Sequence, residues 1–143
     1  MSGYKVVRAD DARDYYADSD VPGEFRRLTD LLGAEQLAAT LIRIPPHSDF
    51  EQGTGHHHAE IEEIYIIGSG ELTMRFGDEI VKVPAGSVVR VEPKTPRSHR
   101  NEGDVTVDMW AISPKIDHDD STLIRKFWPA SAKAAQKRPH RNT

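Results

Sequence analysis

The sequence predicts an all-β domain, a sandwich or jelly roll, and three observations support this prediction. Short apolar runs of strand length recur through residues 21–116, and Gly or Pro residues separate them. The run at residues 105–112 alternates, so that Val105, Val107 and Met109 share one face. With 143 residues, the chain has the length of one domain that can bury a sizeable core.

Turn residues set the bounds of the expected strands. The first 20 residues are polar and rich in Asp, which predicts an arm with one short strand. Pro22 and Gly23 mark a turn, after which residues 25–32 fit either a strand or one helical turn. Pro45 and Pro46 end the next strand and begin a loop. The expected strands are residues 4–8, 25–32, 36–44, 61–67, 71–76, 79–83, 87–91, 97–101 and 105–112.

The later turns are also rich in Gly, Pro and Asp. Gly68 and Gly70 lie between two apolar runs, which predicts a hairpin that joins residues 61–67 to residues 71–76. Further corners are expected at residues 77–78, 84–86, 93–96 and 102–104.

The composition excludes several classes of protein. The chain has no Cys, which excludes disulfides, thiolate metal sites and Cys nucleophiles. No apolar run approaches the length of a membrane span, and the N-terminus lacks the basic and apolar regions of a signal peptide. We therefore expect a cytoplasmic protein without a membrane partner.

The charge is distributed unevenly along the chain. The formal net charge is −4, but residues 131–143 contain four Lys or Arg residues and no acid, so residues 1–130 carry −8. An acidic body argues against a nucleic-acid partner. We expect the basic tail to be disordered and to aid solubility, rather than to contact phosphates or an acidic partner.

Four regions are expected along the chain. They are an N-terminal arm at 1–20, a barrel at 21–116, a C-terminal extension at 117–130 and the basic tail at 131–143. In the extension, Phe127 and Trp128 are large apolar residues that would be unusual if exposed on a monomer. We expect them to pack on the barrel or on a second copy of the chain.

One short segment carries the strongest functional signal. Side chains alternate in a strand, so His56 and His58 point to one face while His57 points to the other. Glu63 can return to the face of the imidazoles after a short turn, and Glu62 is the alternative carboxylate. Two imidazoles and one carboxylate that converge from one side suit a divalent transition metal with open coordination positions. The segment therefore predicts a metal centre rather than a solvated turn.

These residues resemble the first motif of the cupin family, in which His-x-His is followed by Glu and then by Gly. His56, His58, Glu63 and Gly70 fit that spacing, whereas Phe50 stands where the motif has an earlier Gly. The resemblance extends from about residue 24 to residue 113, and its first motif is fairly specific.

The second cupin motif is only partly present. Gly86 and Asn101 hold its two ends in register, but Glu92 and Lys94 replace its Pro and its Gly. Arg97 stands where the family usually has a fourth metal ligand, a His. A guanidinium stays protonated in proteins and cannot donate a lone pair to a metal.

Arg97 leaves four arrangements open. The centre could use His56, His58 and Glu63 alone. His99, two residues further along the same strand face, could become a fourth ligand if a bulge shifted it. Arg97 could instead bind a carboxylate or phosphate of a substrate, or it could pair with Glu63 in a barrel without metal.

The resemblance to cupins implies a fold and an activity. The fold is a double-stranded β-helix, the cupin jelly-roll barrel, with a strand rather than a helical turn at residues 25–32. The activity is a metal-dependent reaction on a small anionic or oxygenated molecule, with dioxygenase chemistry expected and isomerase, decarboxylase or cyclase chemistry as alternatives. The cofactor would be Fe, Mn, Ni or Zn. Small cupins are commonly dimers, so we also expect a homodimer.

Phase counting within such a barrel places Tyr65 and His99 inside it. Either residue would supply a general acid or base. Trp110 or Met109 would line the substrate pocket beside Tyr65, and Arg97 would bind the substrate. The competing functions are a non-catalytic binding or sensing cupin, and a structural protein whose barrel is filled with side chains.

Overall fold

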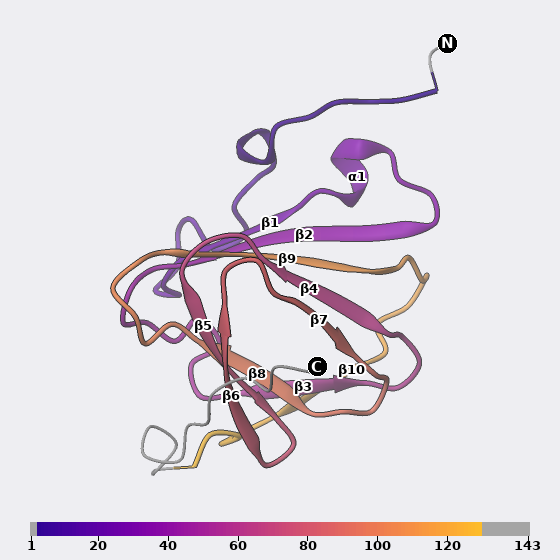
Figure 1. Cartoon of the computed structure of the whole chain (residues 1–143). Helices are drawn as coiled ribbons and strands as arrows, with labels where there is room; N and C mark the ends of the chain where they lie inside the picture. The colour runs from indigo at the N-terminus through magenta and orange to yellow at the C-terminus, as the bar shows by residue number, and fades with distance from the viewer. Residues whose placement is uncertain (1–2, 130–143) are drawn as a thin grey trace.

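The computed structural model describes residues 3–129, and its strands form a two-layered jelly-roll barrel (Figure 1). The strands are β1 (Glu24–Arg27), β2 (Leu37–Ile44), β3 (Gly55–His58), β4 (Glu63–Ile67), β5 (Glu71–Phe76), β6 (Glu79–Pro84), β7 (Val88–Val91), β8 (Arg97–Arg100), β9 (Val107–Pro114) and β10 (Ser121–Ile124). One antiparallel sheet has the order β1-β2-β9-β4-β7, and the other has the order β10-β3-β8-β5-β6. The all-β jelly-roll prediction is confirmed.

The hydrophobic core lies between the two sheets. Its fully buried side chains come from alternate positions of strands in both layers, and they include Ile44, Ile67, Leu72, Met74 and Met109. The predicted alternation in the last long strand holds for the inward residues Val107 and Met109. Val105 precedes that strand and is 59% exposed.

The hairpin predicted around Gly68 and Gly70 is wrong. β4 and β5 belong to different sheets, so the chain crosses from one layer to the other at this corner. The Gly68 N–H donates to the Asp108 carbonyl, and the Gly70 carbonyl accepts from the Ala85 N–H, so the corner bonds to other segments. Gly70 has a φ of +69°, and a Cβ there would lie 2.8 Å from Val107 Cγ2. The Gly residues correctly predicted a turn here, but they did not predict that the turn joins strands of different sheets.

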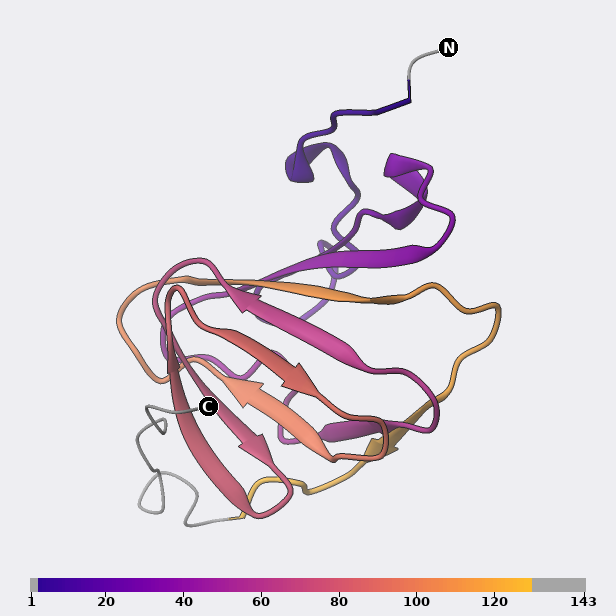
Figure 2. The same cartoon turned by 45° about the vertical axis from the view of Figure 1, so that its right-hand side comes forward.

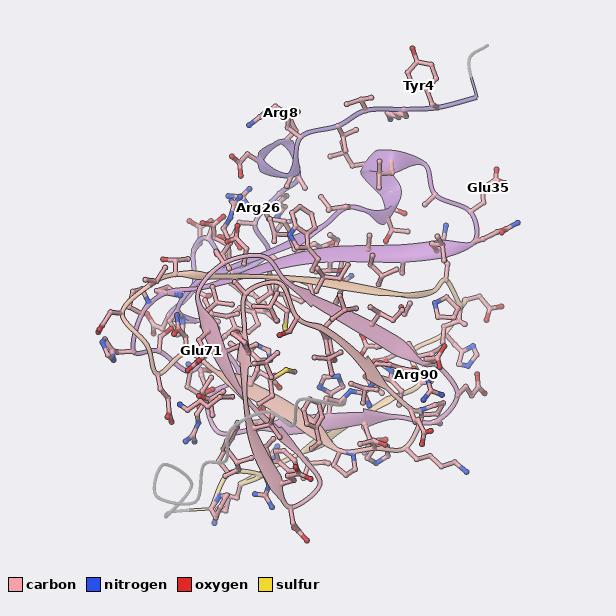
Figure 3. The ribbon with its side chains drawn as sticks, in the orientation of Figure 1. Tyr4, Arg8, Arg26, Glu35, Glu71 and Arg90 are labelled. Carbon is pink, nitrogen blue, oxygen red and sulfur yellow. The ribbon has the colours of Figure 1, made fainter. Side chains whose placement is uncertain are left out.

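The strand predicted at residues 4–8 is also wrong. These residues are extended without a partner strand, and a short 3-10 helix, η1 (Ala9–Asp11), follows them. Tyr4 projects from this arm and is 77% exposed (Figure 3).

Residues 25–32 contain both of the structures considered for them. β1 ends at Arg27, and the helical turn α1 (Thr29–Leu32) ends at Gly33, which has a φ of +68°. α1 and the arm lie on the outer side of β1 and β2 (Figure 2). A second apolar cluster of Ala12, Leu28 and Leu41 forms beneath them.

The C-terminal extension adds a strand and an apolar cover to the second sheet. β10 pairs with β3, with Ser121 opposite His58 and Leu123 opposite His56. Beyond it, Trp128 is 7% exposed and its Nε1–H donates to Ser98 Oγ at 2.8 Å. The extension therefore packs on the barrel of its own chain. The predicted basic tail at 131–143 lies outside the described residues.

Within residues 3–129, no helix is long and apolar enough to cross a membrane.

Candidate metal centre

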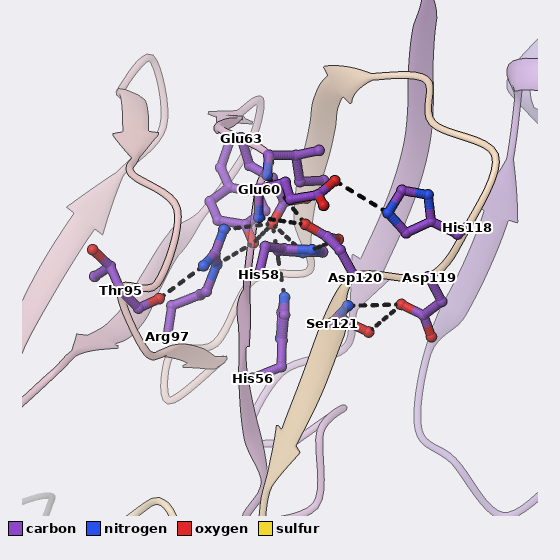
Figure 4. Close-up of polar contacts among 12 residues, drawn as sticks. His56, His58, Glu60, Glu63, Thr95, Arg97, His118, Asp119, Asp120 and Ser121 are labelled. Carbon is purple, nitrogen blue, oxygen red and sulfur yellow. Dashed lines mark hydrogen bonds and ion pairs between the residues drawn. The ribbon is translucent and has the colours of Figure 1, made fainter.

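The two imidazoles of the predicted site share one face of β3. His56 and His58 point between the sheets, and His57 lies at the intervening position of the strand, whose side chains face the other way. After β3 the chain crosses to the opposite sheet, where Glu63 begins β4. Glu63 Oε1 lies 3.2 Å from His58 Nε2 and 3.7 Å from His56 Nε2 (Figure 4). The three residues that the sequence placed together thus come from both layers of the barrel.

These distances fit a metal ion. The ligand atoms of His56, His58 and Glu63 all lie within 4.8 Å of one another. Two ligand atoms at right angles around an ion, each about 2.1 Å from it, are about 3 Å apart. Two nitrogens and one carboxylate oxygen are also the donor set that suits a transition metal with open positions. Glu62, the alternative carboxylate, points away and pairs with Arg90 at 2.5 Å.

A carboxylate lies near Nδ1 of each imidazole, the ring nitrogen that does not face Glu63. Asp120 Oδ1 lies 2.6 Å from His58 Nδ1, and Glu51 Oε2 lies 3.8 Å from His56 Nδ1. A carboxylate at Nδ1 favours the tautomer that carries its proton there and leaves the Nε2 lone pair for a metal. Asp120 Oδ2 also accepts the backbone N–H groups of Glu60 and Ile61, which holds the corner between β3 and β4. Neither carboxylate was predicted, because no spacing rule links them to the motif.

Arg97 lies behind Glu63 and does not line the cavity. It is 1% exposed, and its side chain donates to Glu63 Oε1 at 2.9 Å, to the Tyr65 hydroxyl at 3.3 Å and to the Thr95 carbonyl at 2.7 Å. β3 and β8 pair with His56 opposite Arg97, which brings the guanidinium next to the three-residue group. The structure therefore differs from the expectation that Arg97 binds a substrate anion, and it contains the Glu63 ion pair instead.

Tyr65 also forms a hydrogen bond with Glu63. Its hydroxyl donates to Glu63 Oε1 at 2.7 Å. Burial raises the pKa of Tyr65 well above its ordinary value, and the neighbouring carboxylate raises it further. Tyr65 therefore remains a hydrogen-bond donor rather than a base, although its side chain lines the cavity.

His99 lines the cavity but stands apart from the three-residue group. Its Nδ1 lies 2.5 Å from Glu51 Oε1, and it is not among the described residues whose donor atoms gather around a possible ion. His99 Nε2 is buried and has no hydrogen-bond partner within residues 3–129. Within the described residues, His99 is therefore not placed with the three candidate ligands.

The imidazoles and carboxylates of the site lie close enough to shift one another's pKa. Burial works against the charged form of His56, but Glu51 and Glu63 together raise the pKa of its imidazole to about 9. Burial likewise opposes ionisation of Glu51, yet the facing His99 and His56 lower the pKa of Glu51 to about 2. The pKa of Glu63 is also lowered, because hydrogen bonds from His56 and His58 outweigh its burial. Glu63 is therefore ionised, as a ligating carboxylate must be, whereas His56 in the absence of a metal holds a proton that a bound ion would displace.

A cavity of about 770 Å³ opens beside these residues. Met109 lines it, whereas Trp110 does not. Trp110 packs on the outer face of β9 against the cluster of Leu28 and Leu41, because adjacent residues of a strand face opposite ways. Of the two residues proposed for the pocket, Met109 is therefore the one that reaches it.

The sequence matches the family model described as a cupin domain over residues 40–113. No curated protein matches it. Among solved structures, a candidate sugar phosphate isomerase from Acidithiobacillus ferrooxidans is 23% identical with a TM-score of 0.59; the match covers 70% of this chain and 64%, less than two thirds, of that one. A cupin protein from Bacteroides fragilis is 20% identical with a TM-score of 0.63, and 82% and 88% are covered. A predicted oxalate decarboxylase from Thermotoga maritima is 21% identical with a TM-score of 0.63, and 78% and 100% are covered. At these identities the likeness establishes the fold.

Proposed function

The chain belongs to the cupin family, and from this premise we propose that it is a metal-dependent enzyme acting on a small oxygenated or anionic molecule. One observation supports this proposal above the others: His56, His58 and Glu63 converge beside an open cavity. A bound Fe, Mn, Ni or Zn ion would supply a Lewis acid with open positions, and Fe(II) would add redox chemistry with dioxygen. Dioxygenase-type chemistry is the reaction that we propose.

The protein residues have distinct roles in this proposal. His56 and His58 would present Nε2 to the ion, with Asp120 hydrogen-bonded to Nδ1 of His58 and Glu51 3.8 Å from Nδ1 of His56. Arg97 and Tyr65 hold the Glu63 carboxylate in place from behind.

His99 is the proton-exchange group of the proposal. Its ring lines the cavity, its Nδ1 lies 2.5 Å from Glu51 Oε1, and its buried Nε2 has no hydrogen-bond partner within residues 3–129. Arg27 is the only Lys or Arg among the described residues that line the cavity. It takes over from Arg97 as the cation that an anionic substrate would meet.

The fold alone does not select the reaction. The similar structures described above include a candidate isomerase and a predicted decarboxylase, and those reactions, like a cyclisation, are alternatives for this site. The preference for dioxygenase chemistry rests on a donor set of two imidazoles and one carboxylate with open positions. A homodimer and a cytoplasmic location also remain predictions from the sequence.

A non-catalytic binding protein is the second candidate, and the Arg97–Glu63 pair is the observation that favours it. A guanidinium 2.9 Å from Glu63 and two imidazoles at 3.2 and 3.7 Å can satisfy the carboxylate without a metal. In that case the cavity would take an organic ligand directly. The two functions differ in whether an ion binds at His56 and His58.

Elemental analysis of the untagged protein tests this difference. We expect about one transition-metal ion per chain in the wild type, and loss of that ion in His56→Ala. His57→Ala is the matched control, because the same residue type is removed from the opposite face of β3, and its metal content should equal that of the wild type.

A wild type without metal, even after anaerobic reconstitution with Fe(II), Mn(II), Ni(II) and Zn(II), would overturn the enzyme proposal in favour of the binding protein. With metal established, oxygen consumption in the presence of small oxygenated acids and phenols would test the dioxygenase chemistry.

A further inference from the structure

One wall of the cavity is aromatic. Tyr16 reaches it from the segment before β1, Phe25 from β1, and Phe50 from the loop between β2 and β3. We call these three residues the aromatic wall. Three segments that are separate in the sequence therefore present rings to the same space.

The rings form an ordered row. Phe25 and Phe50 are stacked, with centroids 6.1 Å apart and planes 6° from parallel. Phe50 and His99 continue the row at 6.1 Å and 17°. Tyr16 stands edge-on to Phe25 at 5.9 Å and to Phe50 at 5.6 Å. Such offset-stacked and edge-to-face pairs are the preferred arrangements of aromatic side chains.

The row runs from a partly exposed tyrosine towards the metal centre. At one end Tyr16 is 39% exposed, and at the other end His99 contacts Glu51, which in turn faces His56. Phe25 and Phe50 also pack against the main core, which holds their rings in place. A molecule beside the metal ligands therefore shares its cavity with aromatic side chains that the core holds in place.

The wall formed by β2 and β9 is largely apolar, whereas Asp117, His118, Asp119 and Ser121 add polar groups elsewhere in the lining. Thr40, Ile42, Met109 and Ala111 line the cavity from β2 and β9. The volume of about 770 Å³ is that of a site for a molecule with one or two rings and their substituents. A ligand with its apolar part against these side chains and its polar atoms at the three-residue group would match both kinds of lining.

We infer that the substrate is a planar aromatic molecule with two adjacent oxygen donors, its ring against the aromatic wall and its oxygens directed to His56, His58 and Glu63. The position of the oxygens rests on the proposed metal-dependent function. The position of the ring rests on the aromatic wall alone.

Binding of two probes to the metal-loaded protein tests the inference. Catechol carries two adjacent oxygens on an aromatic ring, and lactate carries two adjacent oxygens without a ring. We expect Phe50→Leu to weaken catechol binding about 3- to 10-fold in calorimetry, because one stacked ring is lost, and to leave lactate binding unchanged. Phe25→Leu should act in the same direction.

Phe76→Leu is the matched control, because Phe76 packs against the same core without lining the cavity. It should leave both affinities unchanged. If Phe50→Leu weakens catechol and lactate equally, or changes neither, while metal content stays at the wild-type level, the aromatic inference is overturned and the proposed function stands.

Experiments on the metal-free protein further distinguish failure of the aromatic site from failure of the proposed metal-dependent function. Phenol should perturb the NMR signals of Phe25 and Phe50, and cyclohexanol should do so much less at equal concentration. If the wild type binds no metal but shows this preference, the proposed enzyme fails and the aromatic site survives. If phenol and cyclohexanol behave alike, the aromatic site fails.

Discussion

Asp120 Oδ1 lies 2.6 Å from Nδ1 of His58, although 62 positions separate the two residues in the sequence. The contact forms because β10 pairs with β3 directly beside the metal motif. The same carboxylate receives the backbone N–H groups of Glu60 and Ile61, so one side chain orients the ligand and holds the corner after it. The C-terminal extension is thereby part of the candidate metal centre.

Asp120→Asn should weaken metal binding about 10- to 100-fold, since partners of ligating imidazoles typically contribute that much. The amide keeps the shape of the side chain but loses the charge that holds His58. Competition with a fluorescent chelator would measure the affinity. Asp119→Asn is the control, because Asp119 contacts Ser121 rather than His58, and its affinity should match the wild type. Equal affinities for all three proteins would contradict the role of Asp120.

Arg97→His should bind metal at least about tenfold more tightly than the wild type. The substitution removes a buried cation beside Glu63 and offers a third imidazole, as a fourth ligand, opposite His56. Arg97→Gln, measured by the same chelator competition, removes the charge without adding a good ligand. If Arg97→Gln tightens metal binding as much as Arg97→His does, the tighter binding comes from loss of the guanidinium charge and not from an additional ligand.

Removal of metal should lower thermal stability. A ligand that binds only the folded state at 100 times its Kd stabilises that state by about 2.7 kcal/mol. For a chain of this length that corresponds to a rise in Tm of about 5–10 °C. Calorimetric scans before and after chelation should show this difference in the wild type and in His57→Ala. His56→Ala should show no difference, and a chelator-sensitive Tm in that variant would place the ion elsewhere.

Gly55→Ala should destabilise the fold by about 1–3 kcal/mol through overpacking. A Cβ at this position would lie 2.6 Å from Phe127 Cδ2 and 2.9 Å from the Arg97 carbonyl oxygen. Gly103→Ala, whose Cβ would meet no atom closer than 3.5 Å, is the matched control and should change stability by about 0.5 kcal/mol or less. Urea unfolding of both variants would measure the free energies. Equal midpoints for Gly55→Ala and the wild type would show that the extension does not pack tightly on β3.

The parts of the site that could be predicted from the sequence are those that depend on neighbouring residues. The two-residue period of a strand put His56 and His58 on one face and His57 on the other, and short spacing brought Glu63 back to them. The same period could not choose between Trp110 and Met109. That choice depends on which face of β9 meets the core, and it follows from pairing with distant strands.

By itself the sequence determined an all-β domain, from its turn positions and alternating apolar residues, and a metal motif, from the spacing of His56, His58 and Glu63. The resemblance to cupins added the jelly-roll barrel. Tertiary structure alone decided that β4 and β5 lie in different sheets, that Arg97 faces Glu63, and that Asp120 stands behind His58. It also assembled the aromatic wall from three separate segments. The physical reason is the same in each case: strand periodicity acts between neighbours in the chain, whereas sheet order and register depend on the packing of both layers around one core.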